Sequence, residues 1–139
     1  MRIYIFFLCI LFVGPCHAVA ADWAVIADTN KDTFILVDTT SIISKNIYVS
    51  FFAKTLFSDH DAKNISNKLK LKVTPKYLIE EDVANCGDKT MYTKNVYYYS
   101  KNGDTITSFR DNQNDFVRVL PESVGEAKLN FVCSIVQQK

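Results

Sequence analysis

The sequence contains little histidine, little glycine and no excess of charge of either sign. Its 139 residues include 2 histidines and 4 glycines, and 16 Lys and Arg stand against 15 Asp and Glu. The balanced charge removes a global electrostatic reason to expect nucleic acid as a partner. So few glycines form no loop of the kind that cradles a phosphate. A chain of this length is expected to fold as one domain with one modest core.

Patterns for catalysis and metal binding are also missing. His60 lies between Asp59 and Asp61 in a polar stretch, and three neighbours in sequence rarely converge on one metal ion. The acidic run at 80–82 is likewise contiguous, so its carboxylates are not expected to face each other across a substrate. We therefore expect no enzyme, no catalytic residues, no cofactor and no metal site.

The first 20 residues have the features of a secretory signal peptide. A basic residue precedes an unbroken apolar run over 3–13, and residues 18–20 are small enough for a leader peptidase. A transmembrane anchor needs about 20 apolar residues, and this run is shorter. The sequence predicts residues 1–20 as a cleaved signal and residues 21–139 as a single exported domain.

Two cysteines remain after the predicted cleavage, Cys86 and Cys133. In an exported domain the simplest expectation is that they form one disulfide. Cys16 raises the alternative of a lipidated first residue of the mature chain. Lipoprotein processing requires a small residue before that cysteine, however, and Pro15 stands there. We therefore expect Cys16 to leave with the signal.

Alternating apolar and polar residues predict most of the mature chain as β-strands. A hairpin is expected over 23–37, a long strand over 46–57, and a second hairpin over 90–110 that turns at Asn102-Gly103. A short last strand over 115–121 ends at a proline. Together these segments predict one antiparallel sheet of about five to six strands.

A C-terminal helix is expected to follow the sheet. Ser123 and Glu126 have the spacing of a capping box, and the apolar residues after them cover most of the helix surface. Such a helix must lie on an apolar surface, and the face of the sheet is the available one. A Cys86–Cys133 bond would hold it there. The predicted fold class is α+β, with the C-terminal helix packed on one face of the antiparallel sheet.

Two features of the sequence are candidates for a binding surface. The polar stretch 58–67 is expected to be a connector between elements. After it, Lys68, Lys70 and Lys72 alternate with apolar residues, which is typical of a strand with one buried and one solvent-exposed face. These lysines form either a cationic stripe for a ligand or the charges that protect an edge strand from aggregation. Tyr98 must point away from its two tyrosine neighbours, and it serves either recognition or packing.

With these elements in place, the chain resembles the surface-adhesin protein E family of Gram-negative bacteria. The resemblance runs from Trp23 to Cys133, and its most specific part is the aromatic-x-x-Val-x-Pro-x-Ser element from Phe116 to Ser123. It implies an antiparallel sheet with a disulfide-held C-terminal helix. It also implies a cell-envelope protein of a family whose namesake members bind host extracellular-matrix or serum proteins. We expect the exported chain to reside in the periplasm, on the outer-membrane surface or in the medium.

A function of a different class stays open beside the adhesin. The chain could be a periplasmic housekeeping or inhibitor-type protein that binds another envelope protein or a small apolar ligand. In either case the expected partner is not nucleic acid, and no transmembrane anchor is expected. A homodimer is also possible, because an open antiparallel sheet leaves unpaired edge strands.

Overall fold

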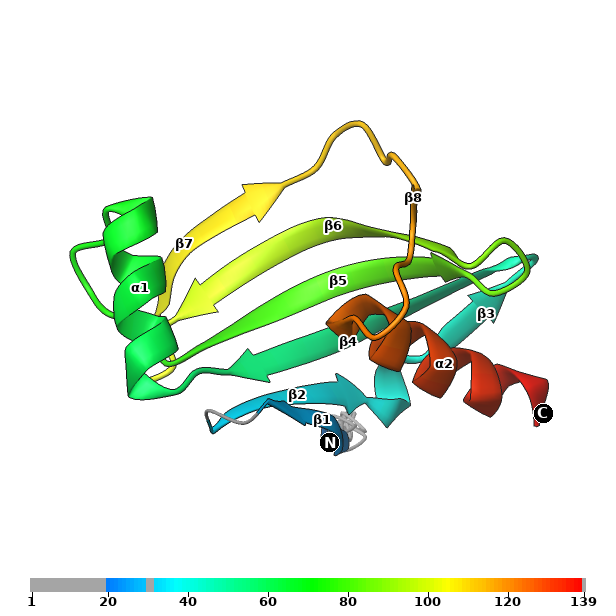
Figure 1. The fold of residues 1–139 in the computed structure, drawn as a ribbon, viewed down its shortest axis with the longest axis horizontal. Helices are drawn as coiled ribbons and strands as arrows, with labels where there is room; N and C mark the ends of the chain where they lie inside the picture. Colours follow the sequence, from blue (N-terminus) through cyan, green and yellow to red (C-terminus); the bar gives the residue numbers. More distant parts are fainter. Residues whose placement is uncertain (1–19, 30–31, 139) are drawn as a thin grey trace, which may run out of the picture.

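The computed structural model describes residues 20–29 and 32–138, so residues 1–19 of the predicted signal peptide lie outside the described residues. One antiparallel sheet of eight strands dominates the fold (Figure 1). Its main path runs, in spatial order, through β1 (Trp23–Thr29), β2 (Thr33–Asp38), β4 (Tyr48–Leu56), β5 (Tyr77–Asn85), β6 (Thr90–Tyr99) and β7 (Thr105–Arg110). The short β3 (Ile43–Lys45) pairs with β4, and β8 (Val117–Arg118) pairs with β6.

The predicted fold class is confirmed, with eight strands in place of about five to six. Both expected hairpins and the long strand between them are present as β1–β2, β6–β7 and β4. At the turn after β6, Gly103 has φ +88° and its amide donates to the carbonyl of Ser100 at 3.1 Å. This positive φ explains why glycine occupies the position. The predicted strand over 115–121 is shorter than expected, with only Val117–Arg118 paired.

The C-terminal helix α2 (Val124–Gln137) begins as predicted. The Ser123 hydroxyl accepts a hydrogen bond from the Glu126 amide at 3.1 Å. The Glu126 carboxylate accepts from the Glu122 amide at 2.7 Å, one residue earlier than in the usual capping box. These two bonds satisfy the backbone amides of Glu126 in the first turn and of Glu122 just before the N-cap.

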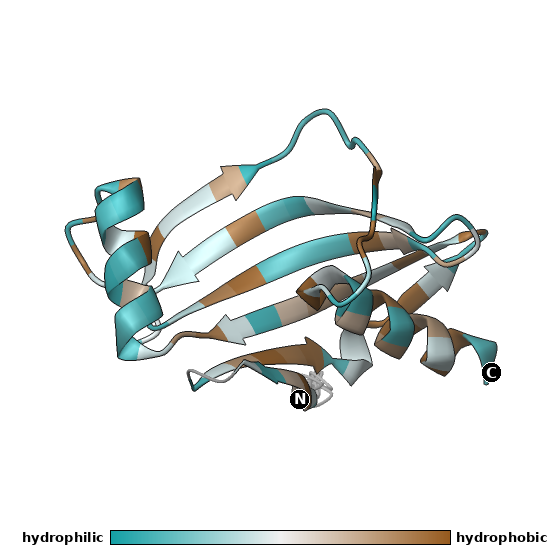
Figure 2. Ribbon diagram, in the orientation of Figure 1, coloured by the Kyte–Doolittle hydropathy of each residue, from teal (hydrophilic) through white to brown (hydrophobic). Residues whose placement is uncertain are grey.

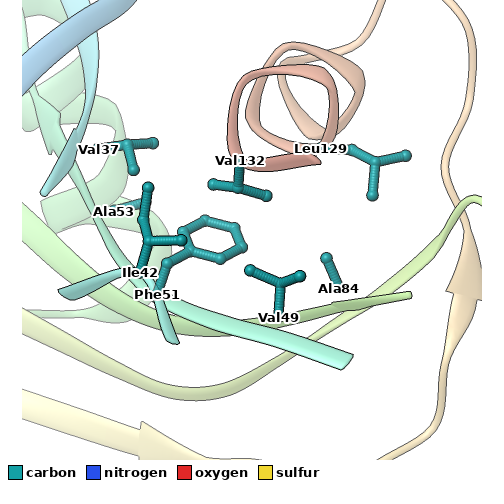
Figure 3. Packing of buried hydrophobic residues seen from close by; sticks show 8 residues of the cluster. All are labelled: Val37, Ile42, Val49, Phe51, Ala53, Ala84, Leu129 and Val132. Atoms are coloured by element: carbon teal, nitrogen blue, oxygen red, sulfur yellow. The ribbon is translucent and has the colours of Figure 1, made fainter. Parts of the chain in front are cut away.

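Helix α2 packs on the sheet to form the main core. Figure 3 shows Val132 pointing from the helix toward Phe51 and Val49 of β4. The other buried members of this cluster are Val37, Ile42, Ala53, Ala84 and Leu129. The predicted disulfide is confirmed: Cys86 follows β5, and its Cα lies 5.8 Å from that of Cys133 in α2. The bond joins the helix to the turn between β5 and β6.

A second helix, α1 (Asp59–Leu69), occupies the stretch that we expected to be a connector. The Ser58 hydroxyl caps the helix by accepting a hydrogen bond from the Asp61 amide at 3.1 Å. The negative charges of Asp59 and Asp61 in the first turn interact favourably with the helix dipole. Most of α1 is hydrophilic (Figure 2). Ala62 is its buried residue, and it packs with Phe57 at the opposite end of the sheet from α2 (Figure 1).

The predicted lysine strand is therefore wrong. Lys68 lies in the last turn of α1, Lys70 ends the helix in the left-handed conformation with φ 52°, and Lys72 lies in the connection to β5. The Lys70 and Leu71 amides donate to Asn67 and Ser66 carbonyls, so this segment satisfies its backbone as a helix end instead of a sheet ladder. The alternation of lysine and apolar residues reflected the end of a helix and a loop.

A buried ion cluster lies between α2 and the sheet. Lys128 of α2 is 4% exposed, and its Nζ donates to Asp82 Oδ2 at 2.9 Å and also to the Glu80 carboxylate. Asp82 is fully buried, and its second oxygen accepts from the Thr93 hydroxyl at 2.6 Å. Glu80 and Asp82 are two residues apart in β5, so they lie on one face of the sheet. The acidic run at 80–82 therefore does bring two carboxylates together, around a lysine.

The protonation of this cluster follows from its burial. Burial raises the pKa of Glu80 above its ordinary value, and the neighbouring Lys128 ammonium only partly counteracts this. Burial works against the Lys128 ammonium, but Asp82 and Glu80 outweigh it and raise the pKa of Lys128. The Lys128 contribution to stability is present at neutral pH and is lost only in strong alkali. The Glu80 contribution is full below its ordinary pKa of 4.5 and is lost as pH rises through its folded-state pKa.

Replacing both Cys86 and Cys133 with serine should leave the fold in place and destabilise it. The bond closes a loop of 47 residues, for which chain entropy gives about 4 kcal/mol of stabilisation as an upper figure. Urea unfolding of the two proteins measures the difference. Equal unfolding midpoints would show that α2 packing alone holds the helix.

Asp82→Asn and Glu80→Gln should differ sharply in stability. Asp82→Asn removes the fully buried partner of Lys128 and should cost about 3–5 kcal/mol. Glu80→Gln should cost far less at pH 7, because burial opposes the charged form of Glu80 and raises its pKa. On acidification from pH 7 to pH ~4, the wild type should gain free energy of unfolding relative to Glu80→Gln. The opposite trend would contradict the assigned pKa direction.

Candidate functional site

The two faces of the sheet differ in what covers them. Val49, Phe51 and Ala53 of β4 point to the face on which α2 packs, and Phe57 continues this face to α1. Side chains alternate along a strand, so the residues between them point to the opposite face. We call that opposite face the open face. Its members on the central strands are Tyr48, Phe52 and Lys54 of β4, Tyr77, Ile79 and Glu81 of β5, and Tyr97 and Tyr99 of β6.

Aromatic rings are concentrated on the open face around Lys54. The rings of Tyr77 and Tyr99 stack with centroids 4.9 Å apart and an angle of 13° between their planes. The Lys54 Nζ lies 4.3 Å from the centroid of Tyr77 and 5.4 Å from that of Trp23. The rings therefore hold the ammonium group by cation–π interactions. Within the described residues, no carboxylate lies within ion-pair distance of Lys54.

A shallow cavity of about 250 Å³ opens on this face, and neither Lys54 nor Tyr77 is among its lining residues. Its lining residues come from five neighbouring strands, so the cavity runs across the strands; they are Trp23, Asp38, Phe52, Ile79, Tyr97 and Tyr99. We call it the aromatic groove. Phe52 is 40% exposed, whereas Trp23 and the two tyrosines are half-buried. Rings that are positioned by the sheet and still reach solvent can contact a ligand without further ordering.

Glu81 lies on the same face, outside the lining of the groove, and its carboxylate is engaged by residues of β6. A bulge in β6 brings both Lys94 and Asn95 to Glu81, at 2.6 Å and 2.5 Å from its two carboxylate oxygens. Burial opposes the charge of Glu81, but these hydrogen bonds and the positive charges of Lys94 and Arg110 lower its pKa. The negative charge of Glu81 is therefore compensated by its partners on β6, and the charged residue that lines the groove itself is Asp38.

A second aromatic group covers the far end of the open face. The Phe116 ring stacks on Tyr48 at 5.2 Å and meets Tyr92 edge-on at 4.7 Å. The segment before β8 carries Phe116 there. This packing gives the Phe116 element of the sequence a structural role.

The structure separates the residues of the predicted binding surface. Lys70 and Lys72 line a cavity of about 640 Å³ between the end of α1 and the β6–β7 turn, with Asp104 among its other lining residues. Lys68 and Tyr98 are not part of that lining. Whether this lysine surface binds a ligand stays a prediction.

Tyr98 does point away from Tyr97 and Tyr99, as the alternation requires. It lies on the helix-bearing side, where its ring packs against Phe57 at 6.4 Å and edge-on against Phe109 at 6.0 Å. Burial, and secondarily the charge of Glu80, raises the pKa of Tyr98. These contacts are those of a packing residue.

The residues that sequence reasoning missed are Trp23, Lys54, Tyr97 and Tyr99. A signal was present: Phe52 and Lys54 alternate with the buried residues of β4, and Tyr97 and Tyr99 share a face. Only the pairing of the strands shows that these faces coincide. His60, expected in a loop, lies in α1 with Nε2 3.1 Å from the Asn64 amide nitrogen.

Residues 20–29 and 32–138 contain neither a cluster of metal-ligating side chains nor a membrane-spanning helix. No group of three or more His, Cys, Asp or Glu side chains is placed to hold a metal ion within this part of the chain. None of the helices described here has the length and apolar character needed to cross a bilayer.

The fold defines a class of small α+β domain, in which a disulfide anchors a C-terminal helix to one face of an antiparallel sheet. The sequence profile of surface-adhesin protein E matches residues 23–134, and the chain belongs to this family. The resemblance inferred from the sequence is thereby confirmed. The comparison with curated proteins gives no match at the required significance.

Solved structures of Haemophilus influenzae protein E have the same fold. Crystal form II is 12% identical, with a TM-score of 0.59, and the match covers 88% of this chain and 95% of that one. A second structure of protein E is 12% identical, with a TM-score of 0.57 and coverage of 91% and 95%. Protein E from a non-typeable strain gives 12% identity, a TM-score of 0.53 and coverage of 91% and 84%.

Lys54→Gln should change the surroundings of Trp23 with little loss of stability. The substitution keeps most of the side-chain length and removes the charge between the rings, so we expect a cost of about 0.5–1 kcal/mol. Trp23 is the sole tryptophan, and its emission spectrum reports the change directly. An unchanged spectrum would show that Lys54 does not contact the indole in solution.

Proposed function

We propose that this protein is an exported, non-enzymatic adhesin of the bacterial envelope and that it binds host extracellular-matrix or serum proteins through the open face. One observation carries the proposal: a member of a surface-adhesin family has an exposed aromatic face opposite its two helices. Trp and Tyr dominate binding hot spots, because they provide a large contact area at little cost in conformational entropy.

The two faces of the sheet have different roles, and this difference supports the proposal. The helix-bearing face holds the core cluster, the disulfide and the buried Lys128 cluster, so changes there affect stability. The open face holds rings that reach solvent beside an ammonium group. A partner could dock on it without displacing either helix.

The predicted lysine surface is a second place for a partner. Lys70 and Lys72 are exposed at the mouth of their cavity, whose hydroxyl and amide groups come from Ser100, Asn102, Thr105 and Thr107. Paired variants separate the two surfaces, because the lysines lie outside the lining of the aromatic groove.

A Tyr97→Ser/Tyr99→Ser variant should lose binding to matrix proteins by about 30-fold or more, the effect of removing one hot-spot residue. Surface plasmon resonance on immobilised collagen, fibronectin and laminin measures it, with the egg-white protein ovalbumin as control and circular dichroism to confirm folding. Lys70→Gln/Lys72→Gln is the matched variant and should bind like the wild type.

Three outcomes would count against the proposal. Loss of binding only in the lysine variant would move the site to the lysine surface. No binding of the wild type to any matrix or serum protein would overturn the adhesin function. Detection of the protein only in the periplasm, by protease treatment of intact cells, would favour a partner within the envelope.

A further inference from the structure

Asp38 is the charged residue in the lining of the aromatic groove, and it is almost completely buried, with 7% of its surface exposed. Its neighbour Val37 belongs to the core cluster, so alternation turns Asp38 to the open face. Across β1 and β2, Asp38 pairs with Trp23. On its other side Val37 pairs with Ala53, which brings Phe52 next to Asp38. Asp38 therefore lies between two aromatic residues of the groove.

Within the described part of the chain, the Asp38 carboxylate has no counter-ion. Its Oδ1 accepts hydrogen bonds from the Asp22 amide at 3.0 Å, from the Thr40 amide at 3.0 Å and from the Thr40 hydroxyl at 2.7 Å. These donors hold the carboxylate in position, but they carry no net charge. Among residues 20–29 and 32–138, no side-chain nitrogen of Lys, Arg or His lies within 4.0 Å of it. A carboxylate removed from water without an opposite charge costs free energy, so a cation that enters the groove is bound favourably.

The remaining lining of the groove suits a flat cation. Four of its residues contribute aromatic rings, and the face of a ring attracts positive charge. The volume of about 250 Å³ accommodates one ring-sized group. A guanidinium group is planar, stacks on aromatic rings and is less strongly hydrated than an ammonium group. The groove therefore favours the side chain of arginine over that of lysine.

Lys54 limits where such a cation can lie. Its Nζ lies 4.3 Å from the centroid of Tyr77 and 5.4 Å from that of Trp23, and it is outside the lining of the groove. A second cation on those two rings would meet a like charge. Phe52 and Tyr97 hold no cation within the described residues. A guanidinium group is therefore expected on these two rings, on the side of the groove where Asp38 lies beside Phe52.

The floor of the groove accepts a side chain more readily than a backbone. Strands β2, β4 and β5 are hydrogen-bonded to neighbours on both sides, so their backbone groups are already paired. A peptide backbone pressed on this face would bury amides without partners, which costs free energy. A long side chain avoids this cost, because its end enters the groove while the backbone that carries it stays in solvent.

We infer that the aromatic groove binds an arginine side chain of a protein partner, with the guanidinium group on the rings of Phe52 and Tyr97 and donating a hydrogen bond to the Asp38 carboxylate. The inference rests on the proposed function in using the same open face. It adds the chemistry of the group that the partner inserts.

An acetylated and amidated hexapeptide of alternating glycine and arginine tests this assignment, because guanidinium groups are its only charges. It is titrated into the protein purified from cells that express the full chain. Trp23, the sole tryptophan, lines the groove, so its fluorescence should change and saturate. The same peptide with citrulline in place of arginine keeps the shape without the charge, and it should bind about tenfold more weakly or less. A lysine version should also bind more weakly than the arginine peptide.

Asp38→Asn should weaken binding of the arginine peptide by about tenfold or more, through loss of a charge-assisted hydrogen bond. Asparagine keeps the Oδ1 acceptor, so the fold should remain, and circular dichroism checks this. Asp104→Asn is the matched control, because it removes an exposed carboxylate outside the groove. It should bind like the wild type.

Two further variants test the position of the cation. Phe52→Ala removes an exposed ring without touching the hydrogen bonds of Asp38, and it should weaken binding by about threefold. Lys54→Gln removes a like charge near the groove, so it should bind the arginine peptide about threefold more tightly.

Several results would overturn the inference. They are the absence of a saturable change in the folded wild type, equal affinity for the citrulline peptide, and equal affinity of Asp38→Asn and Asp104→Asn. If Asp38→Asn does not fold, unchanged binding by a folded Phe52→Ala variant overturns it. Tighter binding of the lysine peptide would identify the site as one for ammonium groups instead.

The same proteins also separate this inference from the proposed function. Binding to matrix proteins that depends on Tyr97 and Tyr99, without any binding of the arginine peptide, would leave the adhesin function standing and refute the arginine site. Binding of the arginine peptide that depends on Asp38, without binding to any matrix or serum protein, would do the reverse.

Discussion

The packing of α2 on β4 and β5 is the contact on which the rest of the structure depends. Val132 and Leu129 cover Val49, Phe51 and Ala84, which removes the largest apolar surface of the sheet from water. The disulfide ties the helix to the turn after β5. Lys128 adds a directional constraint, because its ammonium must meet Asp82 beneath the helix. A shift of α2 along the sheet would leave that charge unpaired in the interior.

Covering one face determines what the other can do. Because residues alternate along each strand, the positions between the buried ones on β4 and β5 must point to the open face. Here those positions carry aromatic rings and Lys54. Both helices lie on the opposite side, so the open face keeps rings in contact with solvent. A rigid sheet can present such rings without a cost of ordering at the moment of binding.

Much of the fold could be predicted from local patterns. Period-two alternation placed β4 and the two hairpins, the Ser123–Glu126 spacing placed the start of α2, and the two remaining cysteines predicted the disulfide. Helix α1 was missed although Ser58 and Asp61 have the spacing of a capping box. Its polar composition made it look like a connector, and the lysines after it imitated a strand.

The candidate site was harder to predict, because it is made by strands that are distant in the sequence. Tyr98 was chosen over Tyr97 and Tyr99, yet the pairing of β6 with β5 turns Tyr98 toward the helices. By itself the sequence determined the strands, the caps and the available disulfide, since these depend on neighbours along the chain. The tertiary structure alone decided which faces coincide. It brought Lys128 between two carboxylates and Lys54 between Trp23 and Tyr77, because strand order and helix position arise from contacts between distant segments.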